Sequence, residues 1–366
     1  MRFKRLLIFS VFIFVFELVT AQSQKVINIP DIPGYTTLKC DFHMHTVFSD
    51  GTVWPTVRVQ EAWEEGLDAI SITDHIEYLP HSKDITADHN RSYDIAQPLA
   101  SEMNIILVKG AEITRSMPPG HLNVLFITNA NLLERDDVND ALKEARDQGA
   151  FIFWNHPCWE AQQPDTVIWW DKHTELMEND LIHGIEVFNS GLCNEALDWA
   201  NEKRLTMFGN TDVHGPMKVR EKHRPMTLVF AKKRNESGIK EALFNRRTVV
   251  YYGNTLVGES RYLEPLFFGS LDYNRTSLQL KNKEHKTVQI KNNSDLDYQL
   301  ELLQPGVGFD APETLTLKSH HITSLELQGN SDQVNNMENL NVYYQVKNMK
   351  VSSDDDLVVT FSFRNN

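Results

Sequence analysis

Between residues 36 and 252, short apolar runs alternate repeatedly with charged, amphipathic runs, and this alternation limits the possible folds. The apolar runs are rich in β-forming residues, and the runs between them have the periodicity of helices with one apolar face. Strands that are apolar along their whole length are typical of a parallel sheet covered by helices. So many consecutive strand–helix units, with no glycine-rich phosphate loop after the first strand, favour a closed barrel over an open doubly wound sheet.

The periodicity also places the individual elements of this α/β region. We expect strands at residues 38–43, 68–73, 105–112, 121–127, 151–155, 184–188, 206–210 and 227–231. We expect helices at residues 55–66, 92–103, 134–148, 194–203 and 236–245. Pro55 at its first turn and Gly66 at its end delimit the first helix.

After residue 258 the pattern changes to short alternating runs separated by clusters of Asn, Ser, Asp and Gly, and no helical period is expected there. Such a pattern is typical of a small antiparallel β-sandwich. We expect its strands at residues 278–280, 287–290, 298–303, 314–317, 322–327, 342–346 and 357–363. The chain is therefore divided into a signal peptide at 1–21, a barrel at 22–257 and a β-sandwich of unknown role at 258–366.

The N-terminus has the three parts of a secretory signal: basic residues within 2–5, an apolar core at 6–16 and small residues at 19–21, before a cut near Gln22. The apolar run is short for a membrane span, so we expect cleavage, with an uncleaved anchor as the alternative. We therefore expect a periplasmic or secreted protein that keeps no stable membrane anchor.

Composition limits the partners. The formal net charge of −14 disfavours duplex nucleic acid as a partner, because such binders usually present a basic face. A small phosphorylated substrate stays compatible with this charge, since bound metal ions add local positive charge. The odd set Cys40, Cys158 and Cys193 is too small for a disulfide framework, so we expect three buried thiols, with one bridge as the alternative.

Histidines and acids follow the carboxyl ends of the expected strands. In a barrel of parallel strands these ends share one rim, where chemistry gathers. His121 begins its strand, but the turn at 113–120 returns it to the same rim. His183 lies at the opposite end of its strand and is interpreted as structural. The candidate ligands at the rim are His43, His45, Asp50, His75, Glu112, His121, His156, Asp212 and His214.

Neutral imidazole and carboxylate groups are preferred ligands of Zn²⁺, Mn²⁺ and Fe²⁺. These nine residues are too many for one ion. We therefore expect two or three divalent ions, with one carboxylate bridging a pair. Asp74 is expected to position the loop beside His75 and not to bind metal itself.

The motifs HMHTVFSDG, TDH, GAEI, GHLNVLF, NHP and GNTDVH, in this order over residues 38–257, resemble those of the PHP (polymerase and histidinol phosphatase) superfamily of metal-dependent phosphoesterases. The resemblance implies a distorted (β/α)7 barrel with a trinuclear site of zinc, manganese or iron. It implies one ion at His43, His45, Glu112 and Asp212, a second at Glu112, His121 and His156, and a third at Asp50, His75 and His214. Asp50 stands where some members of the superfamily have His.

This site would hydrolyse a small phosphomonoester or phosphodiester. Water between two divalent cations ionises near neutral pH and attacks phosphorus in line. The residues expected to hold this metal-bridging hydroxide are Glu112, Asp212, His43, His45 and His156. We expect no side-chain nucleophile, since no GxSxG motif is present.

Substrate contacts are less well marked in the sequence. Arg115 in the rim turn could clamp a phosphate, and the basic loop at 218–224 offers Arg220 and His223 for an anionic substrate. Asn155, Asn189 and Asn210 end strands and could orient ligands. The candidates for core or lid packing, in preference to stacking on a substrate ring, are Trp154, Trp159, Trp169 and Trp170.

Two alternative functions remain open at this point. An amidohydrolase-type enzyme would also open with HxH, but the late Asp212-x-His214 motif and the acid Glu112 fit it less well. The other alternative is a non-catalytic binding protein whose barrel is a relic, which the complete ligand set disfavours.

Overall fold

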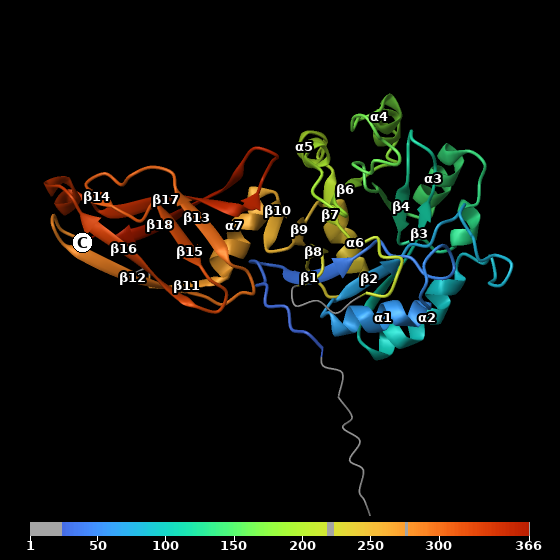
Figure 1. Ribbon diagram of the computed structural model, residues 1–366, viewed down its shortest axis with the longest axis horizontal. Coiled ribbons are helices and arrows are strands. Elements are labelled where there is room, and N and C mark those ends of the chain that lie inside the picture. Colours follow the sequence, from blue (N-terminus) through green and yellow to red (C-terminus); the bar gives the residue numbers. More distant parts are fainter. Residues whose placement is uncertain (1–23, 218–222, 275–276, 366) are drawn as a thin grey trace, which may run out of the picture.

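The structure is a computed structural model that describes residues 24–217, 223–274 and 277–365 of the 366-residue chain. The expected signal peptide and Arg220 lie outside these residues. Figure 1 shows two bodies side by side, a barrel surrounded by helices and a β-sandwich that ends the chain. No helix within the described ranges has both the length and the apolar character needed to cross a membrane.

The barrel is built on one long mixed sheet whose strands lie in the order β9-β8-β1-β2-β3-β4-β5-β6-β7. The pairs β1–β2, β2–β3, β5–β6 and β6–β7 are parallel, as predicted, whereas β4 and β8 run antiparallel to their neighbours. The strands are β1 (Thr36–Asp41), β2 (Ala69–Ile72), β3 (Ile106–Ile113), β4 (Leu122–Leu125), β5 (Phe151–Trp154), β6 (Gly184–Phe188), β7 (Thr206–Gly209), β8 (Met226–Ala231) and β9 (Thr248–Tyr252).

Side-chain hydroxyls close the barrel where β7 meets β8 and β9. Thr227 Oγ1 on β8 donates to the Gly209 carbonyl at 2.9 Å and accepts from the Gly209 N–H at 3.0 Å. Thr248 Oγ1 on β9 donates to the Met207 carbonyl at 2.8 Å. Among the described strand pairs β7 pairs with neither β8 nor β9, so the hydroxyls of these two buried threonines make the contacts at this seam.

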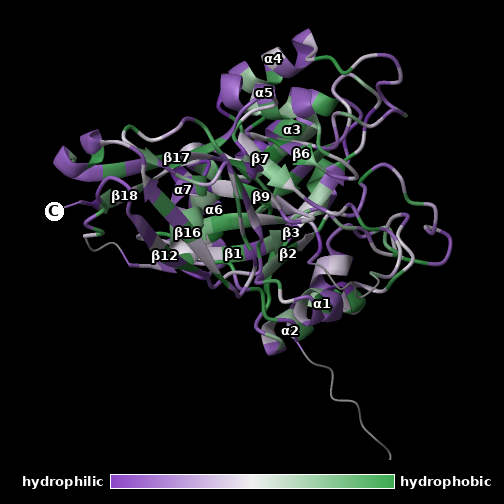
Figure 2. Cartoon of the chain, turned by 60° about the vertical axis from the view of Figure 1, so that its left-hand side comes forward, coloured by the Kyte–Doolittle hydropathy of each residue, from purple (hydrophilic) through white to green (hydrophobic). Residues whose placement is uncertain are grey.

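Helices cover the outside of the strands, and the apolar strands lie within (Figure 2). The helices are α1 (Pro55–Glu64), α2 (Arg91–Glu102), α3 (Val138–Asp147), α4 (Asp171–Glu178), α5 (Asn194–Lys203) and α6 (Glu236–Phe244). Five of them were predicted, but α3 begins at Val138 because Asp137 accepts a hydrogen bond from Asn139 N and caps it. The sequence analysis missed α4, whose buried His173 stacks on Trp154 with the ring centroids 3.8 Å apart.

The C-terminal body is the predicted antiparallel β-sandwich. One layer has the order β11-β12-β16-β14, and the other contains β15, β13, β17 and β18. Buried and exposed side chains alternate along its strands, which is the pattern of sheets with one buried face. Its strands are β11 (Leu271–Tyr273), β12 (His285–Asn292), β13 (Tyr298–Leu302), β14 (Phe309–Asp310), β15 (Thr314–Leu317), β16 (Ile322–Gly329), β17 (Asn339–Lys350) and β18 (Asp356–Arg364).

Two expectations for this C-terminal region are wrong. Residues 260–269 form helix α7 (Ser260–Gly269), which buries Tyr262, Leu263, Leu266 and Phe267. The spacing of these four residues is helical, and Pro265 within the run obscured it. Residues 278–280 form no strand in the described structure.

The sheet continues from the barrel into the sandwich. Strand β10 (Thr255–Gly258) pairs antiparallel with β9 and parallel with β17. A single apolar cluster extends from Val59 on α1 to Phe361 on β18. The sandwich is therefore packed onto the side of the barrel through a shared core.

The expectation of three buried thiols is also wrong, because Cys158 and Cys193 form a disulfide and only Cys40 is a free, buried thiol. Cys158 follows β5 and Cys193 follows β6. Since these two strands are parallel neighbours, their carboxyl ends bring the two Cα atoms within 5.7 Å, a distance that suits a disulfide.

Candidate metal centre and active site

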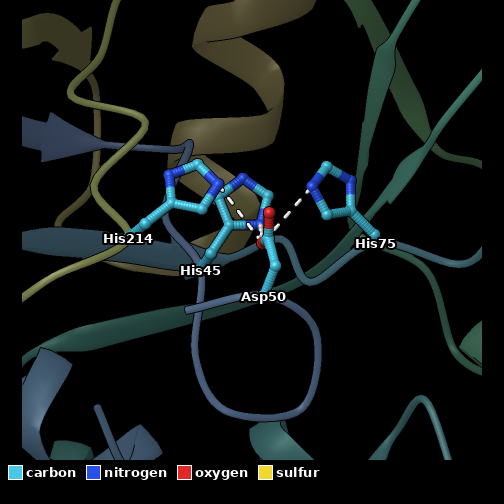
Figure 3. Close-up of side chains that lie close together, drawn as sticks. All are labelled: His45, Asp50, His75 and His214. Atoms are coloured by element: carbon cyan, nitrogen blue, oxygen red, sulfur yellow. Dashed lines mark ion pairs between the residues drawn. The ribbon is translucent and has the colours of Figure 1, made fainter. Parts of the chain in front are cut away.

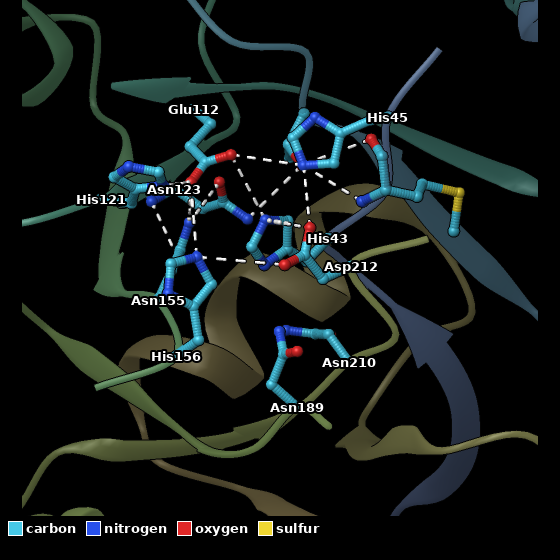
Figure 4. Close-up of polar contacts among 12 residues, drawn as sticks. His43, His45, Glu112, His121, Asn123, Asn155, His156, Asn189, Asn210 and Asp212 are labelled. Atoms are coloured by element: carbon cyan, nitrogen blue, oxygen red, sulfur yellow. Dashed lines mark hydrogen bonds and ion pairs between the residues drawn. The ribbon is translucent and has the colours of Figure 1, made fainter. Parts of the chain in front are cut away.

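The structure brings all nine candidate ligands together at the carboxyl end of the barrel. Strand ends deliver most of them, and the predicted hairpin β3–β4 returns His121 to the rim beside Glu112. The loop after β1 carries Asp50 to the same place. Segments separated by as much as 171 positions, from His43 to His214, thus form a single centre (Figures 3 and 4).

Glu112 lies at the middle of the centre and is fully buried. Its Oε2 lies 3.4 Å from His43 Nε2 and 3.3 Å from His45 Nε2. Its Oε1 lies 2.8 Å from His121 Nδ1 and 3.8 Å from His156 Nε2 (Figure 4). Oε2 also lies 3.0 Å from His75 Nδ1, so the two oxygens of this one carboxylate face five histidines, three at Oε2 and two at Oε1.

Asp212 completes the first of these groups. Its Oδ1 lies 3.2 Å from His43 Nε2 and 3.0 Å from His45 Nε2, and its Oδ2 lies 4.0 Å from His156 Nε2. The backbone of Asp212 has φ 50°, which is unusual for a residue other than glycine. The Asp212 N–H donates to the His43 carbonyl at 2.8 Å, so this conformation is tied to the end of β1.

A third group forms around Asp50 (Figure 3). Asp50 Oδ1 lies 3.2 Å from His214 Nε2, 3.5 Å from His75 Nε2 and 3.8 Å from His45 Nδ1. All four side chains present one ligand atom to a common point. The described residues thus contain several overlapping groups of side chains, each of which could hold a divalent cation.

The chemistry of these donors fits divalent cations. His45 Nε2, His121 Nδ1 and Asp212 Oδ1 are buried and make no well-aligned hydrogen bond in the described structure, although each lies within 3.0 Å of a histidine nitrogen or carboxylate oxygen of the centre. Buried polar atoms normally have a well-aligned partner, and bound cations would be such partners for these three atoms.

The carboxylates and imidazoles of the centre shift one another's pKa values. Burial alone would raise the pKa of Glu112, but His43 and hydrogen bonds from His121 and His156 hold this pKa well below its usual range. Burial would lower the pKa of His75, whereas its hydrogen bonds to Asp50 and Glu112 raise it to about 10. The carboxylates therefore stay ionised, which is the form that binds metal.

Comparison with known proteins decides the family. A two-domain protein from Bacteroides vulgatus ATCC 8482 containing a predicted PHP-like metal-dependent phosphoesterase is 44% identical to this chain, with a TM-score of 0.88. The match covers 94% of this chain and 100% of the other. This chain belongs to the PHP-like metal-dependent phosphoesterase family.

Other comparisons are weaker or concern a part of the chain. A family model described as an Ig-like domain, DUF5001, matches residues 271–362. A putative metal-dependent phosphoesterase from Bifidobacterium adolescentis ATCC 15703 is 17% identical over 57% of this chain and 96% of its own, with a TM-score of 0.41. An amidohydrolase from Chromobacterium violaceum is 16% identical over 48% of this chain and 88% of its own, with a TM-score of 0.36. No curated protein matches the chain.

Family membership makes the centre that of a metal-dependent hydrolase, and the side-chain groups support the binding of divalent metals. The centre lines a cavity of about 540 Å³. Trp159, Val187, Leu192 and the disulfide-bonded Cys158 and Cys193 are among the other residues that line it. No lysine or arginine lines this cavity among the described residues.

Glu186 on β6 is a functional residue that the sequence analysis missed in this PHP-like chain. It is 1% exposed. Its Oε1 accepts from His43 Nδ1 and Asn210 Nδ2, each at 2.9 Å, and its Oε2 accepts from His156 N at 2.8 Å and Asn189 Nδ2 at 3.1 Å. A metal-binding histidine usually donates its second N–H to such a partner. One acid in the otherwise apolar strand GIEVF was the available signal.

Other residues hold the loops of the centre in place. Asp74 accepts hydrogen bonds from Thr46 N at 2.7 Å and Ser49 Oγ at 2.9 Å, so it fixes the loop that carries Asp50. Asn155 Nδ2 donates to Glu112 Oε1 at 3.0 Å and orients this carboxylate.

The three proposed substrate contacts lie away from the metal-centre cavity or outside the described residues. Arg115 pairs with Glu77 at 2.9 Å and lines a neighbouring cavity. His223 Nε2 lies 2.8 Å from Asp295 Oδ2 of the sandwich, which draws it into the contact between the two bodies. Arg220 falls within residues 218–222, which are not described.

Proposed function

We propose that this protein hydrolyses a small phosphomonoester or phosphodiester at this metal centre. The observation that carries the proposal is the position of the buried Glu112, each of whose two oxygens faces its own group of histidines. That is the arrangement needed to bridge a pair of cations. The family supplies the reaction class, and the substrate size follows from a cavity of about 540 Å³.

Three sets of residues would hold the ions, which we propose to be zinc, manganese or iron. The first set is His43, His45, Glu112 and Asp212, the second is Glu112, His121 and His156, and the third is Asp50, His75 and His214. Soft thiolates do not contribute, because Cys158 and Cys193 are joined to each other.

Bound divalent cations would supply a water molecule that ionises near neutral pH and would neutralise the charge of the phosphate oxygens. The chain's own residues prepare for this chemistry. Glu112 and Asp212 remain ionised, because the neighbouring histidines lower their pKa values more than burial raises them. Glu186 accepts from His43 Nδ1 and so leaves His43 Nε2 aimed at the centre.

We also propose that the protein works in the periplasm or after secretion. The disulfide between Cys158 and Cys193 supports this location, because disulfides persist in oxidising compartments. The basic and apolar N-terminal residues supply the export signal in this proposal.

The test is hydrolysis by the purified protein before and after removal of metal. The panel contains p-nitrophenyl phosphate, bis(p-nitrophenyl) phosphate, an aryl amide and a lactone. We expect hydrolysis of at least one phosphoester, loss of it after chelation and recovery on adding back Zn²⁺ or Mn²⁺. Full activity of the stripped protein, or activity on the amide or lactone alone, would contradict the proposal.

A further inference from the structure

A second cavity of about 560 Å³ adjoins the metal-centre cavity. His121 and Trp159 line both cavities, so the two open on either side of the same pair of side chains. His121 is also a proposed ligand of the second ion. Ligand groups in either cavity would therefore contact the same two side chains.

Two exposed aromatic side chains line this second cavity. Trp159 is 46% exposed and Tyr78 is 53% exposed, although both stand beside proposed metal ligands. The Trp159 ring centroid lies 5.6 Å from that of His121 and 5.1 Å from that of His156. The Tyr78 ring lies 6.0 Å from that of His75. Large aromatic surfaces left open at a site are suited to stacking with a ring of the ligand.

Trp159 is held in place before any ligand binds. Its N–H donates to the His156 carbonyl at 2.9 Å, and its own carbonyl accepts from Gln162 N at 3.0 Å. The preceding residue, Cys158, is tied to Cys193 by the disulfide. Because the backbone around Trp159 is already ordered, stacking on it would cost little conformational entropy.

The charge of the second cavity indicates what kind of ring it would accept. Arg115 and Glu77 both line it and pair with each other at 2.9 Å, so their charges largely cancel. Ser116 and Gln162 add neutral polar groups to the lining. This lining suits an uncharged ring with a few polar substituents better than a second phosphate.

We propose that the second cavity binds the alcohol part of the phosphoester, and that this alcohol is uncharged and bears a ring that stacks on Trp159, with Tyr78 in the same lining. The inference rests on the proposed phosphoesterase function and adds the class of the leaving alcohol. Phenols and sugars both fit this description, and the experiment distinguishes them.

Binding is measured first, by calorimetry with the metal-loaded protein and two phosphonates that cannot be hydrolysed as esters. Phenylphosphonate and methylphosphonate share the charged group, and only the first has a ring. We expect phenylphosphonate to bind about tenfold more tightly, as for one aromatic stacking contact. Trp159→Ala and Tyr78→Ala should weaken phenylphosphonate binding and leave methylphosphonate within about twofold.

Phe244 provides the matched control, since it is an aromatic residue that is 45% exposed on α6 and lines neither cavity. Phe244→Ala should leave both affinities unchanged. Trp159→Phe keeps a ring and should restore most of the lost affinity, which separates stacking from misfolding of the loop. Equal affinities for the two phosphonates, or equal losses in Trp159→Ala, would overturn the inference.

Rates of hydrolysis then distinguish the two kinds of ring. They also separate a failure of this inference from a failure of the proposed phosphoesterase function. The substrates are p-nitrophenyl phosphate, glucose 6-phosphate and the ring-free glycerol 1-phosphate. Trp159→Ala should raise KM about tenfold for the preferred ring substrate and change kcat little. Hydrolysis of all three with equal kcat/KM would overturn only the ring-binding inference. No hydrolysis of any phosphoester would overturn the proposed function together with it.

Discussion

Replacing Glu186 by glutamine tests how the centre is held together. Glu186 accepts four hydrogen bonds, two at each oxygen, from His43, Asn210, His156 and Asn189. Glutamine has nearly the same shape, but one of its two ends is an NH₂ group that must face donors. Two of the four contacts are therefore lost whichever way the amide is turned.

The positions of the hydrogen-bond donors determine how much metal affinity Glu186→Gln should lose. If the amide NH₂ faces His43, the imidazole loses the partner that fixes its ring. If the NH₂ faces His156 N, the hydrogen bond from this backbone N–H is lost. His156 has φ 31°, a left-handed conformation that needs support from its surroundings. Loss of such an orienting carboxylate typically lowers metal affinity 10- to 100-fold, or about 1.4 to 2.7 kcal/mol.

The assay is a titration of the stripped protein with Zn²⁺ or Mn²⁺, followed by elemental analysis and by phosphoester turnover. Glu186→Gln should shift both curves to higher metal concentration by 10- to 100-fold, and saturating metal should restore most of the turnover. Glu175→Gln is the control, because Glu175 on α4 is a solvent-exposed acid paired with Lys172. Superimposable titrations of Glu186→Gln and the wild type would refute the role given to Glu186.

Three further perturbations test separate parts of the structure. His156→Ala should lower metal content and turnover together, and an unchanged metal stoichiometry would remove His156 from the ligand set. Replacing Cys158 and Cys193 by serine should lower the free energy of unfolding by about 3–4 kcal/mol in a denaturant titration, because the disulfide closes a loop with a sequence separation of 35 residues; equal stability of the two proteins would contradict this. Asp295 joins the barrel to the sandwich, and although burial would raise its pKa, hydrogen bonds from Asn28, His320 and His223 lower it to about 2. Because the pKa of Asp295 in the folded protein lies below its usual value, the ionised carboxylate stabilises the fold above about pH 4, and this stabilisation is lost as the pH falls toward 2. Asp295→Asn should therefore lower the free energy of unfolding at neutral pH and reduce its loss in acid. An acid denaturation profile identical to that of the wild type would count against this role.

The sequence was sufficient to predict the centre because its residues follow a rule of topology. The carboxyl ends of successive barrel strands meet at one rim, so His43, His75 and His156 could be placed together from their positions after apolar runs. Topology also placed Glu112 at this rim, but its bridging role was implied by the resemblance to the PHP superfamily. These predictions needed no knowledge of side-chain packing.

The features that were missed depend on contacts across the fold. Thr227 and Thr248 close the barrel through their hydroxyls, and nothing in their local sequence distinguishes them from other strand threonines. Arg115 is turned toward Glu77, and the disulfide of Cys158 and Cys193 depends on the parallel pairing of β5 and β6. Such partners are set by tertiary structure and not by sequence spacing.

Glu186 and α7 are different, since a signal was present for both. A buried strand that contains one acid needs a partner for that charge, and the rim histidines were the nearest candidates. The apolar residues of α7 repeat with helical spacing around Pro265. The apolar character of the strand hid the one acid, Glu186, and Pro265 hid the helical spacing of α7.

The presence of several cations at this centre can be tested with crystals of the metal-loaded protein, measured at the absorption edges of zinc and manganese. We expect anomalous density from two or three cations, with one between the two histidine groups that Glu112 faces and another beside Asp50. A structure in which Asp50, His75 and Glu112 point away from one another, or a centre that shows no cation after soaking in either metal, would contradict it.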